Sequence, residues 1–310
     1  MKKLFVIILA LALTVLPLVS CNSDTPNDTV DTSNTEQTTE APTSEAATEE
    51  ENKLIAYVED PLLNEIANKI AKSDSYLIFS IGDSITEGKN ASDRKNLDYT
   101  AMFTKKLGEQ FSEKAIYRVD GIKNENTETV DYPTSARLIQ KGTGSSKITV
   151  VRSGYGGNTA KRLIDRSSDF INKEINGETG NLFIICVGIN DSLVNTPEKY
   201  VIPPKYKQQL SELIDMIYES HPDADIILMT PTYVGYDGSW LIMHANAMRA
   251  LAKERQIALI DLNKLWMDHW VEGAGEYGQG DWLNTDSCHP TDIGHEAIAD
   301  EMIRCLFGTK

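Results

Sequence analysis

Short apolar runs recur along the chain and alternate with segments in which apolar residues recur every three or four positions. Runs of about four to eight apolar residues are typical of buried strands, whereas the wider spacing is typical of amphipathic helices. The runs predict strands at Leu77–Ile81, Ile148–Val151, Leu182–Val187, Ile226–Met229 and Ile257–Ile260. The spaced segments predict helices at Asp60–Ser73, Tyr99–Phe111, Ala160–Asn172, Lys205–Glu219, Trp240–Arg255 and Thr291–Leu306.

Strands that alternate with helices predict βαβ units and a parallel sheet. The strands are apolar almost throughout, so helices should cover both faces of the sheet. Right-handed crossovers then favour a three-layer α/β/α domain with a five-stranded parallel sheet. Residues 115–145 contain only hints of short strands and a turn at Asn124–Asn126, and we interpret them as an insertion on the rim of the sheet.

The beginning of the chain has a different pattern. Met1–Lys3 is basic, and Leu4–Leu16 is an apolar run followed by Pro17. This run is too short to span a bilayer comfortably and is typical of a signal peptide. It ends in Leu18-Val-Ser-Cys21, which resembles a bacterial lipobox. The resemblance implies cleavage before Cys21 and lipid on its thiol and new amino group, and an ordinary secretory signal with an incidental cysteine is the alternative.

Between Asn22 and Glu51 the chain has nine acidic residues, no basic residue and hardly an apolar side chain. Such a segment cannot bury enough apolar surface to offset the entropy lost on ordering. We therefore assign residues 1–21 to a signal peptide, 22–53 to a disordered tether and 54–310 to the folded domain. Residues 52–310 carry a net charge of −9, and this acidity argues against nucleic-acid binding and against electrostatic docking on anionic lipid. We expect an extracytoplasmic protein that meets a bacterial membrane only through lipid on Cys21.

Polar motifs follow the predicted strands. Ser84 follows the first strand, Gly157 the second and Asn190 the third, and Asp286 and His289 come after the fifth. The carboxyl ends of parallel strands share one edge of the sheet, and ligands bind in the crevice at that edge. These residues, although far apart in the sequence, should therefore converge in one crevice.

Acyl transfer needs residues of these types. A serine hydroxyl becomes a nucleophile when a base takes its proton, and His289 can be the base for Ser84. Asp286 lies three residues before the histidine and can hold its ring in one tautomer. The backbone N–H groups of Ser84 and Gly157 and the side-chain amide of Asn190 are candidate donors to an oxyanion.

Other interpretations of the same residues remain open. Ser84 can instead be the N-cap of a helix, with Glu87 completing a capping box. Cys288 adjoins His289, so a Cys–His nucleophile is a further alternative. No C-x-x-C motif occurs, and no second histidine follows His295-Glu296, so we expect no metal.

Four sequence blocks resemble those of the SGNH hydrolases, the superfamily of GDSL esterases and lipases. The blocks are Gly82-Asp-Ser-Ile-Thr86, Gly156-Gly-Asn-Thr159, Gly188-Ile-Asn-Asp191 and Asp286-Ser-Cys-His-Pro290. The resemblance covers about residues 76–306. It implies a flavodoxin-like sheet and ester hydrolysis without a metal or cofactor. It also implies roles for particular residues: nucleophile Ser84, triad partners Asp286 and His289, and oxyanion donors Ser84, Gly157 and Asn190.

The substrate is less constrained. Aromatic residues near the same sheet edge can stack on sugar rings or line an acyl pocket, or simply pack: Tyr155, Tyr233, Tyr236, Trp240 and Trp282. An extracytoplasmic setting and family analogy favour removal of acetyl or other short acyl groups from carbohydrate. The alternatives are a lysophospholipase or lipase, which needs an apolar groove, and a non-catalytic glycan-binding lipoprotein on the same fold.

Overall fold

The computed structural model describes residues 60–235, 238–273 and 281–308. The signal peptide, Cys21 and the tether that the sequence predicts lie outside these residues. The strands are β1 (Ser75–Gly82), β2 (Ala115–Asp120), β3 (Ile122–Asn124), β4 (Thr129–Asp131), β5 (Arg137–Gln140), β6 (Lys147–Gly154), β7 (Leu182–Cys186), β8 (Asp225–Met229) and β9 (Ala258–Ile260). The α-helices are α2 (Pro61–Lys72), α3 (Ser84–Glu87), α4 (Tyr99–Gln110), α5 (Ala160–Asp165), α6 (Pro203–Ser220), α7 (Gly238–Arg255), α8 (Leu262–Gly273) and α9 (Asp292–Phe307). In the described part of the chain, no helix has the length and apolar character needed to cross a membrane.

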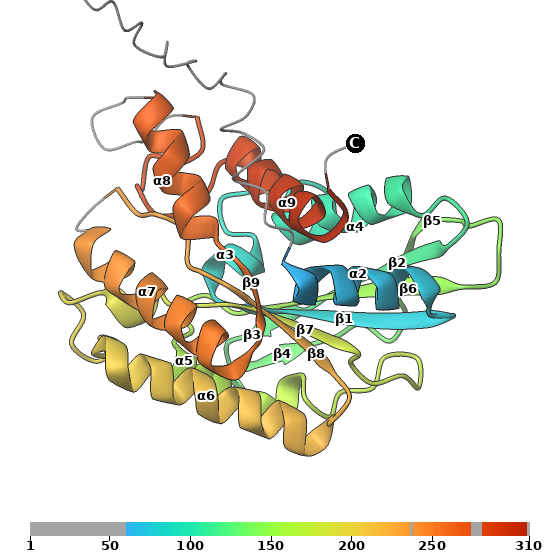
Figure 1. Ribbon diagram of the computed structural model, residues 1–310, viewed down its shortest axis with the longest axis horizontal. Helices are drawn as coiled ribbons and strands as arrows, with labels where there is room; N and C mark the ends of the chain where they lie inside the picture. The colour runs from blue at the N-terminus through green and yellow to red at the C-terminus, as the bar shows by residue number, and fades with distance from the viewer. Residues whose placement is uncertain (1–59, 236–237, 274–280, 309–310) are drawn as a thin grey trace, which may run out of the picture. The chain divides into compact units, whose positions relative to one another are not determined.

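Helices cover both faces of the central sheet (Figure 1). Residues of α2, α4, α8 and α9 pack into the core on one face, and residues of α5, α6 and α7 pack into the core on the other. The side chains of β1 alternate between these layers, with Ile78 in the first core and Leu77 and Phe79 in the second. The predicted three-layer α/β/α architecture is therefore confirmed.

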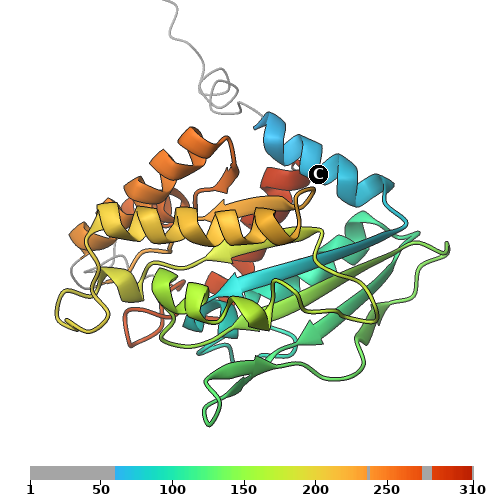
Figure 2. The same cartoon turned by 90° about the horizontal axis from the view of Figure 1, so that it is seen from below.

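The prediction of a five-stranded, wholly parallel sheet is wrong in its strand count. The main sheet has seven strands in the order β5-β2-β6-β1-β7-β8-β9. Six of them run parallel, and β5 pairs antiparallel with β2 at the edge. Both additional strands come from residues 115–145, which also form the separate β3–β4 hairpin beside the sheet (Figure 2). The pattern of β5 was weak because it is an edge strand of four residues whose first two are exposed.

Two helices also differ from the sequence prediction. The helix predicted from Ala160 to Asn172 ends at Asp165 and is followed by a short 3-10 turn at Ser167–Asp169. Helix α8, which directly follows β9, was not among the helices predicted from the sequence. Its Leu262 and Trp266 are buried in the core, and their spacing of four residues was the available signal.

The order of the strands creates a switch point at β1. This strand lies between β6 and β7, and the chain builds the sheet outward on both sides of it. Gly82, at the end of β1, pairs with Gly154 on β6 and with Cys186 on β7. A Cβ atom on Gly82 would lie 2.2 Å from Thr86 Oγ1 and 2.3 Å from the Cys186 carbonyl oxygen, so glycine is required where the chain turns into α3. Open α/β sheets bind ligands at such switch points.

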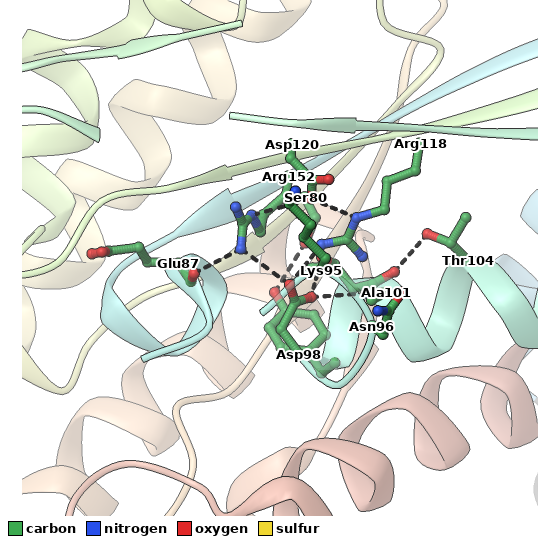
Figure 3. A network of polar contacts seen from close by, with 12 residues as sticks. Ser80, Glu87, Lys95, Asn96, Asp98, Ala101, Thr104, Arg118, Asp120 and Arg152 are labelled. Atoms are coloured by element: carbon green, nitrogen blue, oxygen red, sulfur yellow. Dashed lines mark hydrogen bonds and ion pairs between the residues drawn. The ribbon is translucent and has the colours of Figure 1, made fainter. Parts of the chain in front are cut away.

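A buried ion network lies beneath this turn (Figure 3). Asp98 Oδ2 accepts hydrogen bonds from Arg118 Nη2 at 2.6 Å and Arg152 Nη1 at 3.1 Å. Burial opposes the charge on Asp98, but the two guanidinium groups outweigh it and hold the carboxyl pKa below its usual range. Arg152 Nη1 also donates to the Glu87 carbonyl oxygen at 3.0 Å. The network therefore joins the start of α4, strands β2 and β6, and the end of α3.

We expect Asp98→Ala to lower the free energy of unfolding by about 3–5 kcal/mol, because it leaves buried guanidinium charge uncompensated. Urea denaturation followed by circular dichroism measures this loss. Asp165→Ala is the control, because the Lys161–Asp165 pair is about half exposed on both sides and should change stability by less than about 0.5 kcal/mol. Equal free energies of unfolding for the two variants would contradict a stabilising role for the network.

Candidate active site

Ser84 is the first residue of α3, a single helical turn directly after β1. The helix is capped by Asp83, whose Oδ1 accepts a hydrogen bond from Ile85 N at 2.9 Å. Its C-cap is Gly88, whose φ of +81° is in the left-handed region. The capping-box interpretation is therefore wrong, because Asp83 and not Ser84 is the cap. The Ser84 hydroxyl is left for another partner.

That partner is His289, which is 205 residues further along the chain and contacts Ser84 Oγ through Nε2 at 2.8 Å. The other ring nitrogen, Nδ1, lies 2.7 Å from Asp286 Oδ2. Burial opposes ionisation of Asp286, but hydrogen bonds from His289 and from the Cys288 backbone outweigh it and lower its pKa to about 2. An ionised carboxylate only accepts hydrogen bonds. Nδ1 of His289 must therefore donate to it, which leaves Nε2 able to accept the Ser84 proton.

The Asp286–His289 segment is a tight turn. Asp286 Oδ1 accepts hydrogen bonds from Cys288 N at 3.0 Å and His289 N at 2.9 Å. Ser287 has a φ of +55°, which reverses the chain so that the carboxylate faces the ring three residues later. The Leu283–Pro290 bridge closes the loop around this turn. The three-residue spacing of the motif is thus explained by an Asp side chain that folds back over its own backbone.

Gly157 and Asn190 lie in the loops that follow the strands on either side of β1. Gly157 has a φ of +86°, a conformation that side-chain-bearing residues rarely adopt. Asn190 Nδ2 donates to the Asn158 carbonyl oxygen at 2.9 Å, and Asn158 Nδ2 donates to the Gly82 carbonyl oxygen at 3.0 Å. Among the described residues, no hydrogen-bond acceptor is found for the backbone N–H groups of Ser84 and Gly157. These groups therefore remain available to a ligand.

Glu87 fastens the Gly157 loop to the helix that carries Ser84. Its Oε2 accepts a hydrogen bond from Gly156 N at 2.7 Å, and its Oε1 pairs with Arg94 at 3.1 Å. A Cβ atom on Gly156 would lie 2.7 Å from Glu87 Oε2 and 3.7 Å from Ser84 Cβ, so a side chain at this position would displace the Glu87 carboxylate. The distance between the Gly157 loop and α3 is thus fixed by a charge-assisted hydrogen bond.

Two buried carboxyl groups adjoin the site. Burial raises the pKa of Asp83 to about 7 and that of Asp191 to about 7. Asp191 Oδ1 accepts a hydrogen bond from Ala160 N at 3.0 Å and so ties the β7 loop to α5. Because both carboxyl groups are only partly ionised near pH 7, they place less negative charge beside the site than ionised aspartates would. A negatively charged reaction intermediate would therefore meet less repulsion there.

The aromatic residues that the sequence suggested as substrate contacts are mostly occupied by packing. Tyr155 is 6% exposed, and its ring lies beneath the Arg166 guanidinium at 3.7 Å. The Trp282 ring stacks on His269 with centroids 3.5 Å apart. Tyr233 is half-buried against the core. Tyr236 lies outside the described residues. The structure thus leaves little of Tyr155 open to a ligand.

Sequence reasoning missed Asn90, whose Nδ2 donates to Asp286 Oδ2 at 2.7 Å. It also missed the contact of Glu87 with the Gly157 loop. No spacing rule points to either contact, because each bridges separate loops. The alternative Cys–His nucleophile finds no support, since Cys288 packs into the core while His289 faces Ser84. In the described ranges, no three His, Cys, Asp or Glu side chains gather as a group able to hold a metal ion.

The comparison with protein families identifies the chain. A model of the GDSL-like Lipase/Acylhydrolase family matches residues 80–297, more than half of the 310 residues. The chain belongs to this family. The resemblance to GDSL esterases and lipases is thereby confirmed, and family membership supports a carboxylic ester hydrolase.

A relative of this GDSL-like chain in Bacillus subtilis is distant in sequence. The uncharacterized esterase YxiM of Bacillus subtilis (strain 168) is 28% identical over 127 residues, which cover 39% of this chain and 32% of that protein. The match thus spans about a third of the length of the curated relative.

Solved structures of similar fold include three esterases. The acetyl xylan esterase AlAXEase matches 74% of this chain and 100% of its own with a TM-score of 0.55 and 18% identity. A peptidoglycan O-acetylesterase matches 79% of this chain and 95% of its own with a TM-score of 0.55 and 13% identity. A two-domain esterase active on acetylated mannans matches 80% of this chain and 53% of its own with a TM-score of 0.56 and 17% identity. At these identities the likeness shows the fold alone.

Proposed function

We propose that the protein is a serine esterase that hydrolyses carboxylic esters through a covalent acyl-enzyme. The observation that carries the proposal is the 2.8 Å contact between Ser84 Oγ and His289 Nε2, with the opposite ring nitrogen held by an ionised Asp286. A serine is activated by an adjacent base whose tautomer is fixed by a third group. A module that only binds glycans has no need for this arrangement.

In the proposed mechanism, Ser84 Oγ attacks the ester carbonyl carbon while its proton passes to His289 Nε2. The backbone N–H groups of Ser84 and Gly157 hold the oxyanion. An amide nitrogen carries two hydrogens, so Asn190 can donate one to the oxyanion while the other stays on the Asn158 carbonyl. The protonated His289 gives its proton to the departing alcohol, and Asp286 stabilises the imidazolium. Water, activated by the same histidine, then releases the acid from Ser84.

We further propose that the substrates are carbohydrates bearing acetyl or other short acyl groups. The solved structures of similar fold include an acetyl xylan esterase and a peptidoglycan O-acetylesterase, and this analogy supports the proposal. Polar groups also bond to one another on α3 and in the loops after β6 and β7: Asn190 donates to the Asn158 carbonyl oxygen, and Glu87 accepts from Gly156 N. A lipase needs an apolar groove for a long acyl chain. The cavity of about 920 Å³ bordered by α2, α8 and α9 is not lined by Ser84, Asn190 or His289.

We expect Ser84→Ala or His289→Ala to lower the rate of p-nitrophenyl acetate hydrolysis at least about 10³-fold, because the nucleophile and base act as a unit. A serine-directed phosphonate should label the wild-type protein and fail to label Ser84→Ala. Cys288→Ala is the matched control, which should keep its activity. Near-normal rates in the Ser84 or His289 variant would contradict the assignment.

The substrate class is tested with acetylated oligosaccharides, p-nitrophenyl esters of increasing acyl length, and lysolipids. We expect kcat/KM to fall as the acyl chain lengthens beyond a few carbons, since the proposed substrates carry only short acyl groups. Acetylated oligosaccharides should release acetate, measured by coupled assay. Preference for long acyl chains or lysolipids would instead indicate a lipase.

We also propose that lipid on Cys21 anchors the protein outside the bacterial cytoplasm. The basic Met1–Lys3, the apolar Leu4–Leu16 and the terminal Leu18–Cys21 support this proposal. In bacteria that express the full chain and are fed an alkyne-tagged fatty acid, the wild-type protein should carry the label and sediment with membranes. Cys21→Ala should lose both properties, whereas Cys305→Ala should keep them. Label retained after removal of Cys21 would refute the anchor.

A further inference from the structure

Asn90 lies in the polar loop between α3 and α4, and its side chain reaches the proposed triad. Its Nδ2 donates to Asp286 Oδ2 at 2.7 Å, and the same oxygen lies 2.7 Å from His289 Nδ1. A carboxylate only accepts hydrogen bonds, so Asn90 must present its N–H and not its carbonyl oxygen. We propose that Asn90 is a positioning residue that fixes the Asp286 carboxylate and limits how strongly this carboxylate favours protonation of His289.

The hydrogen bonds of Asp286 show why Asn90 matters. Oδ1 accepts from Cys288 N and His289 N, while Oδ2 is shared between the His289 ring and Asn90. Each donor draws negative charge away from the oxygen that it contacts. Asn90 therefore competes with the imidazole for one oxygen. Without its amide, more of the carboxylate charge would act on the ring, and the protonated form of His289 would be stabilised.

The loop holds Asn90 in place from both sides. Asn90 has a φ of +67°, in the left-handed region that asparagine and glycine enter more readily than other residues. Ser92, two residues after Asn90, donates hydrogen bonds to Asp292 on α9 from its backbone N at 2.8 Å and from its Oγ at 2.5 Å. One residue before Asn90, the Lys89 carbonyl oxygen lies 3.4 Å from His295 Nε2. The loop that follows the nucleophile helix is thus fastened to the helix that follows the histidine loop.

Other groups near His289 act on the charge of its ring less directly than the Asp286 carboxylate does. Its own loop contributes Asp286, and α3 contributes the neutral Ser84 hydroxyl. On α9, His295 is electrostatically coupled to it, but burial keeps the pKa of His295 below its ordinary value. Because His295 is then neutral at and above neutral pH, the charge that acts most directly on the His289 ring is the Asp286 carboxylate.

The kinetic consequence rests on the proposed function. Only neutral His289 can take the Ser84 proton, so protonation of the ring produces the acidic limb of kcat/KM. By restraining Asp286, Asn90 extends activity toward lower pH. Its loss should shift the acidic limb to higher pH and should also loosen the geometry of the triad.

The test compares Asn90→Gly, Asn90→Asp and Ser92→Ala. Glycine keeps the left-handed backbone while removing the amide, and aspartate adds negative charge beside Asp286. In Asn90→Gly we expect the acidic limb to move up by about 0.5–1 pH unit, as for a hydrogen bond of about 1 kcal/mol. The plateau of kcat/KM should fall about three- to tenfold. Asn90→Asp should move the limb further. Ser92→Ala, which loosens the same loop without touching the triad, should leave the limb in place.

An NMR titration of the histidine rings measures protonation of His289 without substrate. The His289 signals are assigned by comparison with a His289→Gln variant. The midpoint for His289 should rise in Asn90→Gly and stay unchanged in Ser92→Ala. An unchanged midpoint in Asn90→Gly with a wild-type unfolding curve overturns the inference, as does an equal rise in Ser92→Ala. If the midpoint shifts as expected while the wild-type protein hydrolyses no ester, the proposed function fails and the coupling of Asn90 to His289 stands.

Discussion

A carboxylate with no access to water cannot remain charged without partners, and Asp98 is such a group. Its two arginine partners come from different strands, Arg118 from β2 and Arg152 from β6. Satisfying one buried charge therefore requires two neighbouring inner strands of the sheet and the start of α4 to meet at one point. Arg152 also holds the last carbonyl oxygen of α3, so the turn that carries Ser84 rests on this network (Figure 3).

The segment from Asp83 to Ser92 organises the rest of the site. From it, Glu87 reaches the loop after β6 and Asn90 reaches the loop that carries His289. Ser84 lies on the same segment, at the start of α3, before Glu87 and Asn90. The loop after β6 and the loop that carries His289 are therefore both fastened to the segment that carries Ser84. This explains how side chains on loops far apart in the sequence stay within hydrogen-bonding distance of one another, since each loop is hydrogen-bonded to α3 or to the residues directly after it.

The sequence predicted what depends on local pattern. The five apolar runs are all strands of the main sheet, and the polar residues after them meet at one edge because parallel strands end together. For this reason Ser84 and His289 were placed together correctly although 205 residues separate them. That they act as nucleophile and base stays a prediction until the rates are measured.

What the sequence did not reveal depends on tertiary contacts. β5 carries little apolar pattern because it lies at an edge, and Tyr155 is buried because Arg166 happens to cover it. Asn90 in a polar loop looks like any other turn residue. Its partner is set by how the α3–α4 loop packs on α9, which no spacing along the chain encodes.

Both edge strands of the main sheet are short: β5 has four residues and β9 has three. The edge of a sheet exposes backbone groups that can pair with the strand of another molecule. Arg137 on β5 adds a charged side chain, which bonds back to the Lys95 carbonyl oxygen. Short edge strands leave few unpaired backbone groups with which a strand of a neighbouring copy could form hydrogen bonds. At high protein concentration, the short edge strands therefore disfavour aggregation by strand pairing between copies.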